Sequence, residues 1–146
     1  MNSKKKLFLG IFLLITGMTV TAFVRQSEPW TTEQLMAPAD MAARINKKDA
    51  SLPLLICIGP SGIIKGSIEV GPTRDKENLD KLRKLVSKED RNREIVIYCG
   101  CCPFEHCPNV RPAFVLLMDM HFTHAKLLNL SHNIKTDWID HGYPVK

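Results

Sequence analysis

The chain has 146 residues, enough for one domain around a single hydrophobic core. Its hydrophobic fraction of 45% and charged fraction of 24% are ordinary for a globular protein. The formal net charge is +5, but Lys4, Lys5 and Lys6 supply three of the 20 basic residues, so residues 23–146 carry 17 basic against 15 acidic residues. This near-balance argues against nucleic acid as a partner, because nucleic-acid-binding domains carry a clear basic excess.

The first 22 residues have the layout of a secretory signal peptide. A lysine cluster precedes the apolar core Leu7–Ile15, and Val20 and Ala22 suit the small-residue positions of a signal-peptidase site. The alternative is an uncleaved anchor, because residues 7–24 form an 18-residue apolar stretch, near the lower limit for spanning a bilayer. Both arrangements predict an exported, periplasmic or extracytoplasmic domain that meets the membrane only through residues 7–24, if these are retained.

Short apolar runs alternate with amphipathic stretches along the rest of the chain. Residues 52–58 and 95–98 are too apolar for half-exposed strands, so we expect them at the centre of a sheet. Thr73 and Asp75 are candidate caps for the helix that follows them. Strands alternating with helices predict an α/β fold with a mostly parallel central sheet flanked by helices. The expected elements are a linker at 23–30, strands at 30–35, 52–58, after Gly66, at 95–98 and at 126–130, and helices at 38–45, 75–86, 112–120 and 131–141.

The stretch from residue 93 to residue 114 gathers the residue types that carry chemistry. Four of the five cysteines lie within nine positions, and the first of them, Cys99, directly follows the buried strand 95–98. Parallel sheets place their chemistry at the carboxyl edge, so this strand should deliver Cys99 there. Loop N–H groups and the next helix start should then stabilise a thiolate or a persulfide anion. The other candidate site residues are Cys101, Cys102, His106, Cys107 and Arg111.

The residues around Cys99 suit thiol chemistry. At the end of the loop, Arg111 can hold an oxyanion, such as the leaving sulfite of thiosulfate. Cys101, Cys102 or Cys107 can attack a Cys99 persulfide, which would make the loop a thiol–disulfide or persulfide redox centre. A structural disulfide between Cys102 and Cys107 fits the spacing equally well.

The same loop has enough soft ligands to suggest a metal ion such as Cu(I) or Zn(II). However, the spacing C-x-C-C-x4-C lacks the paired C-x2-C of ordinary zinc sites, so we predict no resident metal and no cofactor. His106 can lower the pKa of Cys107, although a solvent-facing histidine is the simpler interpretation. Cys57, at the end of the strand 52–58, is interpreted as a core cysteine.

In order and spacing, these motifs resemble a single rhodanese-like domain over about residues 31–146. The stretch MAPADMAARI resembles the opening helix of such a domain, and LLICIGP with IKGSIEVG resembles its second strand and glycine turn. The stretch IVIYC resembles the strand that ends in the active-site cysteine, and LLNLSHNIKTDWIDHGYPV resembles the closing strand and helix. The resemblance implies a three-layer fold and a sulfurtransferase or persulfide carrier with Cys99 as the catalytic residue. It also implies a small sulfur donor such as thiosulfate and a thiol acceptor.

The chain departs from the rhodanese-like pattern in its active loop. Cys99 to Arg111 spans 13 residues, including three extra cysteines, whereas the family loop usually runs six residues from cysteine to arginine. Because a fold does not dictate an activity, a non-catalytic module of the same fold that binds a partner is the alternative to an enzyme.

Overall fold

The computed structural model describes residues 27–48 and 50–146. The predicted signal peptide at 1–22, the alternative anchor at 7–24 and the first part of the linker therefore lie outside the described residues. Among the described residues, no helix is both long enough and apolar enough to cross a membrane.

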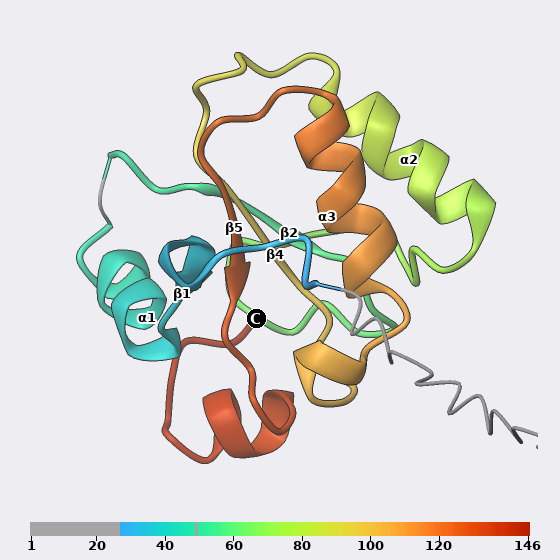
Figure 1. Cartoon of the computed structure of the whole chain (residues 1–146). Helices are drawn as coiled ribbons and strands as arrows, with labels where there is room; N and C mark the ends of the chain where they lie inside the picture. The colour runs from blue at the N-terminus through green and yellow to red at the C-terminus, as the bar shows by residue number, and fades with distance from the viewer. Residues whose placement is uncertain (1–26, 49) are drawn as a thin grey trace, which may run out of the picture.

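A five-stranded parallel sheet forms the centre of the molecule (Figure 1). Its strand order is β1-β5-β4-β2-β3, so β4 lies in the middle. The side chains of β2 and β4 are apolar along their whole length because both faces of these strands are covered. The predicted α/β fold with a parallel central sheet is confirmed. The strands are β1 (Leu35–Met36), β2 (Leu54–Cys57), β3 (Ile68–Glu69), β4 (Ile95–Tyr98) and β5 (Ala125–Leu128).

Helices cover both faces of the sheet and complete three layers (Figure 1). On one face lie α2 (Lys76–Val86) and α3 (Val110–Asp119), and on the other lie α1 (Pro38–Asn46) and the π-helical turn η3 (Lys135–Ile139). The helices predicted at 38–45 and 75–86 are confirmed to within one residue at each end. The arrangement agrees with the three-layer rhodanese-like fold.

Side-chain alternation along β4 decides which way Cys99 faces. Ile95 and Ile97 belong to the core beneath α2 and α3, and Cys99 continues this series. Tyr98 belongs to the opposite core, beneath α1, together with Cys57 from the end of β2. Cys57 has no exposed surface, which confirms its interpretation as a core cysteine. The two thiols therefore lie on opposite faces of the sheet.

The N-terminal strand predicted at 30–35 is wrong in its position. The 3-10 turn η1 (Thr32–Gln34) occupies half of this range, and β1 begins only at Leu35. Trp30, predicted to end the linker, is instead a core residue whose ring lies 5.9 Å from that of Phe104 and 5.7 Å from that of Phe114, between ring centroids. Burial of so large an aromatic surface holds this segment against α3.

The last helix is also shorter than the prediction of 131–141, because regular turns are confined to η3. The Asp137 carboxylate accepts hydrogen bonds from the backbone N–H groups of His132, at 2.7 Å, and Asn133, at 3.1 Å. A side chain thus satisfies N–H groups ahead of η3, and the Ser131 hydroxyl contacts the His132 ring.

Candidate functional site

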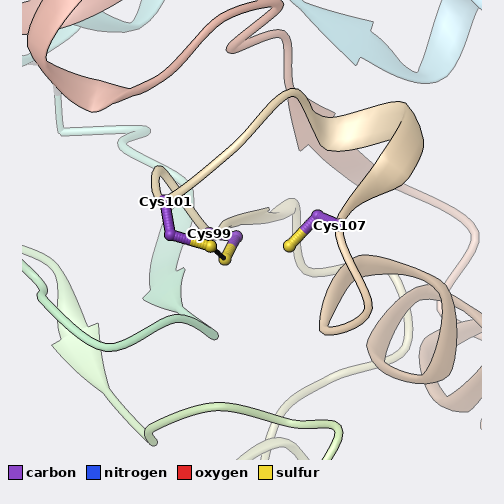
Figure 2. A group of neighbouring side chains, drawn as sticks. All are labelled: Cys99, Cys101 and Cys107. Atoms are coloured by element: carbon purple, nitrogen blue, oxygen red, sulfur yellow. Dashed lines mark hydrogen bonds between the residues drawn. The ribbon is translucent and has the colours of Figure 1, made fainter.

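Three cysteine sulfurs meet just beyond the end of β4 (Figure 2). The Sγ atoms of Cys99, Cys101 and Cys107 all lie within 4.8 Å of one another, and the Cys99–Cys101 separation is 3.1 Å. Cys107, at the end of the 3-10 turn η2 (Phe104–His106), points toward the other two across the loop (Figure 2). Cys99 and Cys107 are each 4% exposed, whereas Cys101 is exposed. Strand β4 thus places Cys99 at the carboxyl edge of the sheet, as expected from the sequence.

Two glycines make this close packing possible. A Cβ atom at Gly59, just after β2, would lie 2.8 Å from Cys99 Sγ and 2.4 Å from the Cys99 carbonyl oxygen. At Gly100, φ is +80°, and a Cβ atom would lie 2.8 Å from Cβ of Ile134. Only glycine tolerates both the close approach and the positive φ. The sequence analysis did not identify Gly59 as part of the site.

Asn109, immediately before α3, connects Cys99 to the loop between β3 and α2, and sequence reasoning missed it. Its Nδ2 donates to Cys99 Sγ at 3.3 Å, and its Oδ1 accepts from the Arg74 backbone N–H at 3.1 Å. Its carbonyl accepts from the Thr73 hydroxyl at 2.6 Å, so Thr73 does not cap α2 as one alternative predicted. An asparagine before a helix is an ordinary capping signal, which points to a helix start and not to a thiol.

The predicted cradle of loop N–H groups around Cys99 is present only in part: the Cys101 amide hydrogen-bonds the Cys99 sulfur, whereas several other loop amides bond to carbonyls. The amide of His106 donates to the Pro103 carbonyl, that of Cys107 to the Phe104 carbonyl, and that of Val110 to the Cys107 carbonyl. These groups are used internally because the enlarged loop coils into η2 and satisfies its own backbone. The side chains of Asn109 and Cys107 join the Cys101 amide around the Cys99 sulfur.

The three thiols differ in how readily they ionise. The Cys107 thiol is the main cause that lowers the pKa of Cys99, to about 5, and the Cys101 amide and Asn109 side chain add to it, against the opposing effect of burial. The same interaction with Cys99, together with burial, raises the pKa of Cys107. Burial and the neighbouring thiols raise the pKa of Cys101 to about 12. Cys99 is therefore the cysteine of this cluster that becomes a thiolate first.

We expect the Cys99 thiolate to persist well below the ordinary cysteine pKa of about 8.5. Because the pKa of Cys99 is lowered to about 5, the anion is retained as the pH falls through neutrality and is protonated only near pH 5. Thiolate ultraviolet absorbance of the reduced, metal-free protein measures this. Cys99→Ser should remove the low-pH step and Cys57→Ala should preserve it, whereas a step that survives in Cys99→Ser assigns the anion to another residue.

A small cavity of about 140 Å³ adjoins the cysteine cluster. Its wall includes Cys101 and Asn109, which both contact Cys99 Sγ, so these two residues lie between the cavity and that sulfur. Arg74, which follows β3, also lines this cavity and was not identified from the sequence; its guanidinium lies 3.9 Å from the Asp75 carboxylate. Three prolines form the remainder of the wall, namely Pro60, Pro72 and Pro108.

The remaining predicted site residues lie around this cluster. Arg111 falls within the first turn of α3, and its side chain pairs with Glu28 at 2.7 Å and lies over the Trp30 ring. His106 is solvent-exposed. The site roles predicted for Arg111 and His106 stay predictions.

Cys102 lies at the margin of the cluster. Its Sγ is 3.3 Å from that of Cys101 but does not belong to the group of three sulfurs that lie within 4.8 Å of one another. All five cysteines are in the described part of the chain, and each is a free thiol. The disulfide between Cys102 and Cys107, one of the alternatives left open by the sequence, is therefore not formed in this structure.

The resemblance to rhodanese-like domains predicted both a fold and a position for the reactive cysteine. The α/β fold is confirmed, and Cys99 follows its central strand. Membership of the family stays a prediction. Comparisons with protein-family models, with curated proteins and with solved structures each found no match for this chain.

Proposed function

We propose that the protein is a sulfurtransferase or persulfide carrier that holds sulfane sulfur on Cys99. One observation carries this proposal: the Cys99 sulfur lies at the carboxyl end of the central strand, beside a cavity, with the Asn109 amide donating to it at 3.3 Å. A donor aimed at a sulfur atom stabilises negative charge there, which both a thiolate and a persulfide carry. The three-layer fold supports the same activity through its resemblance to rhodanese-like domains.

The reaction has two displacement steps. With thiosulfate as donor, the Cys99 thiolate attacks the outer sulfur, a new S–S bond forms at Cys99, and the old S–S bond breaks with its electron pair leaving on sulfite. A thiolate acceptor then attacks the terminal sulfur of the Cys99 persulfide and leaves as a persulfide, which restores the Cys99 thiolate. The Asn109 amide remains in place to stabilise the anion before and after each step.

The cavity limits the donor to a small molecule. Its volume of about 140 Å³ is well below the roughly 300–1,000 Å³ of sites for drug-sized ligands, so an anion of the size of thiosulfate suits it better than a nucleotide or a peptide. Arg74 is the positively charged residue among those that line this cavity. Access to Cys99 requires the side chain of Cys101 to turn aside, and its exposure allows this.

Intact-mass analysis before and after thiosulfate tests the proposal. We expect the reduced protein to gain the mass of one sulfur atom, peptide mapping to place it on Cys99, and a thiol acceptor to remove it. The proposal fails if neither thiosulfate nor a low-molecular-weight persulfide adds sulfur to the protein. It also fails if the added sulfur is found only on another cysteine.

We expect Arg74→Ala to raise the KM for thiosulfate about tenfold with little change in kcat. A charge-assisted hydrogen bond contributes about 1.5–3 kcal/mol, and the exposure of Arg74 favours the lower end of this range. Steady-state sulfur transfer measures both constants. The matched control is Arg111→Ala, which removes the ion pair with Glu28 and should leave the KM unchanged. The opposite pattern would support Arg111 as the anion-binding arginine, as predicted from the sequence, and contradict the role of Arg74.

A second candidate function, thiol–disulfide exchange, is favoured by the 3.1 Å separation of the Cys99 and Cys101 sulfurs. A disulfide bond is about 2.05 Å long, so a movement of about 1 Å would join them. In this reaction the Cys101 thiolate attacks the inner sulfur of the Cys99 persulfide, hydrosulfide leaves, and a dithiol reductant must restore the pair. Cys101→Ser distinguishes the two functions, because it would abolish the disulfide but lengthen the lifetime of a carried persulfide.

A further inference from the structure

Three convergent sulfurs are more than a sulfur carrier requires, since one cysteine suffices to hold a persulfide. The third sulfur is contributed by the enlarged loop. Phe104 is buried in this loop, its amide donates to the Leu130 carbonyl at 3.3 Å, and its ring packs edge-on against Trp30. The short turn η2 that Phe104 anchors brings Cys107 back to Cys99 and Cys101. The extra residues of the loop therefore assemble a site with three thiol ligands.

The spacing of the sulfurs suits a three-coordinate ion. With metal–sulfur bonds of about 2.3 Å, three sulfurs in a planar trigonal site are about 4 Å apart. The observed separations run from 3.1 Å for Cys99 and Cys101 to no more than 4.8 Å. Shifts of about 1 Å would make the three distances equal. The exposed Cys101 is free to make most of this adjustment, while Cys99 and Cys107 are held in the core.

The number and softness of the ligands select among metal ions. Thiolates favour Cu(I), Zn(II) and iron–sulfur clusters. Structural Zn(II) sites are almost always tetrahedral, and iron–sulfur clusters are ordinarily held by four cysteines, whereas the ligand group found among the described residues has three members. Cu(I) has a filled d shell and accepts trigonal coordination by sulfur. We propose that Cys99, Cys101 and Cys107 bind one Cu(I) ion.

The surroundings of the three sulfurs fit a site that is shielded but reachable. Cys99 and Cys107 are nearly inaccessible, which would protect the ion from water and oxygen. Cys101 lines the cavity and is exposed, so an incoming ion meets this ligand first. An external thiol can likewise replace Cys101 and take the ion away by ligand exchange, without prior release of the ion into solution.

Copper binding goes beyond sulfur transfer and does not depend on it. Both use the Cys99 sulfur, so a bound ion and a persulfide should exclude each other. Preloading with Cu(I) is therefore expected to prevent the gain of sulfur from thiosulfate, and removal of the ion by a chelator is expected to restore it. Failure to bind Cu(I) would leave sulfur transfer by the metal-free protein unaffected, so the two proposals can fail separately.

The test is an anaerobic titration of the reduced full-length protein with Cu(I) in competition with bicinchoninate, a coloured Cu(I) chelator. We expect one Cu(I) per chain and a loss of affinity on the order of 100-fold in Cys107→Ser. Cys101→Ser is a second test in case the buried substitution disturbs folding, because it changes an exposed side chain and should lose affinity similarly. Cys102→Ser, in the same loop, and Cys57→Ala, on the other face of the sheet, are controls expected to bind within about twofold of the original protein.

X-ray absorption at the copper edge provides the second readout, with three sulfur neighbours expected in one shell. Unchanged affinity in both Cys101→Ser and Cys107→Ser overturns the proposal, as does a stoichiometry other than one ion per chain. A fourth sulfur neighbour, together with weakened binding in Cys102→Ser, also overturns it. That combination would point to a tetrahedral site of the zinc type.

Discussion

Cys99→Ser is expected to abolish sulfur transfer, lowering its rate more than about a thousandfold, because the substitution removes the nucleophile itself. A serine hydroxyl is not ionised near neutral pH and does not form a persulfide, so neither displacement step has a substitute on this side chain. The hydrogen bond from Asn109 remains available to the smaller oxygen atom, and the fold should be nearly unaffected. The measurements are steady-state transfer from thiosulfate to a thiol and intact mass after exposure to thiosulfate.

Cys57→Ala is the matched control for this loss. Cys57 is also a buried cysteine that ends a central strand, but it belongs to the core on the opposite face of the sheet. Its removal is expected to lower stability by about 1 kcal/mol, through a small cavity, and to leave the rate within about twofold. Sulfur transfer that survives in Cys99→Ser and is lost in Cys57→Ala would move the reactive thiol to the other face of the molecule and refute the proposed mechanism.

The second large effect is expected from Gly59→Ala, a substitution that removes no reacting group. The added methyl group would lie 2.8 Å from Cys99 Sγ and 2.4 Å from the Cys99 carbonyl oxygen. One of the two backbone segments must move, which should lower stability by about 1–3 kcal/mol. A shift of about 1 Å at a reacting group lowers rates about 100-fold, so sulfur transfer should fall by roughly that factor. Thermal unfolding and the transfer assay measure the two effects separately.

Gly66→Ala separates crowding at Cys99 from the general effect of removing a glycine. Gly66 has a positive φ of +82°, but a Cβ atom there would meet nothing within 4 Å. This substitution is expected to lower stability by about 1–2 kcal/mol through backbone strain, while the transfer rate of the folded protein stays unchanged. Equal activity of Gly59→Ala and Gly66→Ala would show that Cys99 tolerates the added methyl group, contrary to the close packing of Gly59 against Cys99.

The elements that the sequence predicts well are those formed by local physical chemistry. An unbroken apolar run such as 95–98 is typical of a strand covered on both faces. This strand could therefore be predicted without knowing which strands lie beside it. Leucines at helical spacing among charged residues predict the helix α2. The position of Cys99 follows for the same reason, because it is simply the residue after the central strand.

The other parts of the site depend on contacts between segments far apart in the chain. Gly59 matters because β2 lies beside β4, and Asn109 matters because the start of α3 lies against both Cys99 and the loop at Arg74. Arg111 illustrates the same dependence, since its side chain pairs with Glu28, 83 residues earlier in the chain. A spacing rule along the sequence carries no information about such partners.

The sequence alone predicts the α/β class, the order of most elements and the thiol that follows the central strand, because each depends on local apolar patterns. Only the tertiary structure decided that Cys107 returns to Cys99 and Cys101, that Cys57 faces the other way, and that Arg74 lines the cavity. The reason is that a loop's path is chosen by the burial of residues such as Phe104 and Trp30 against distant partners. Those contacts exist only once the chain is folded.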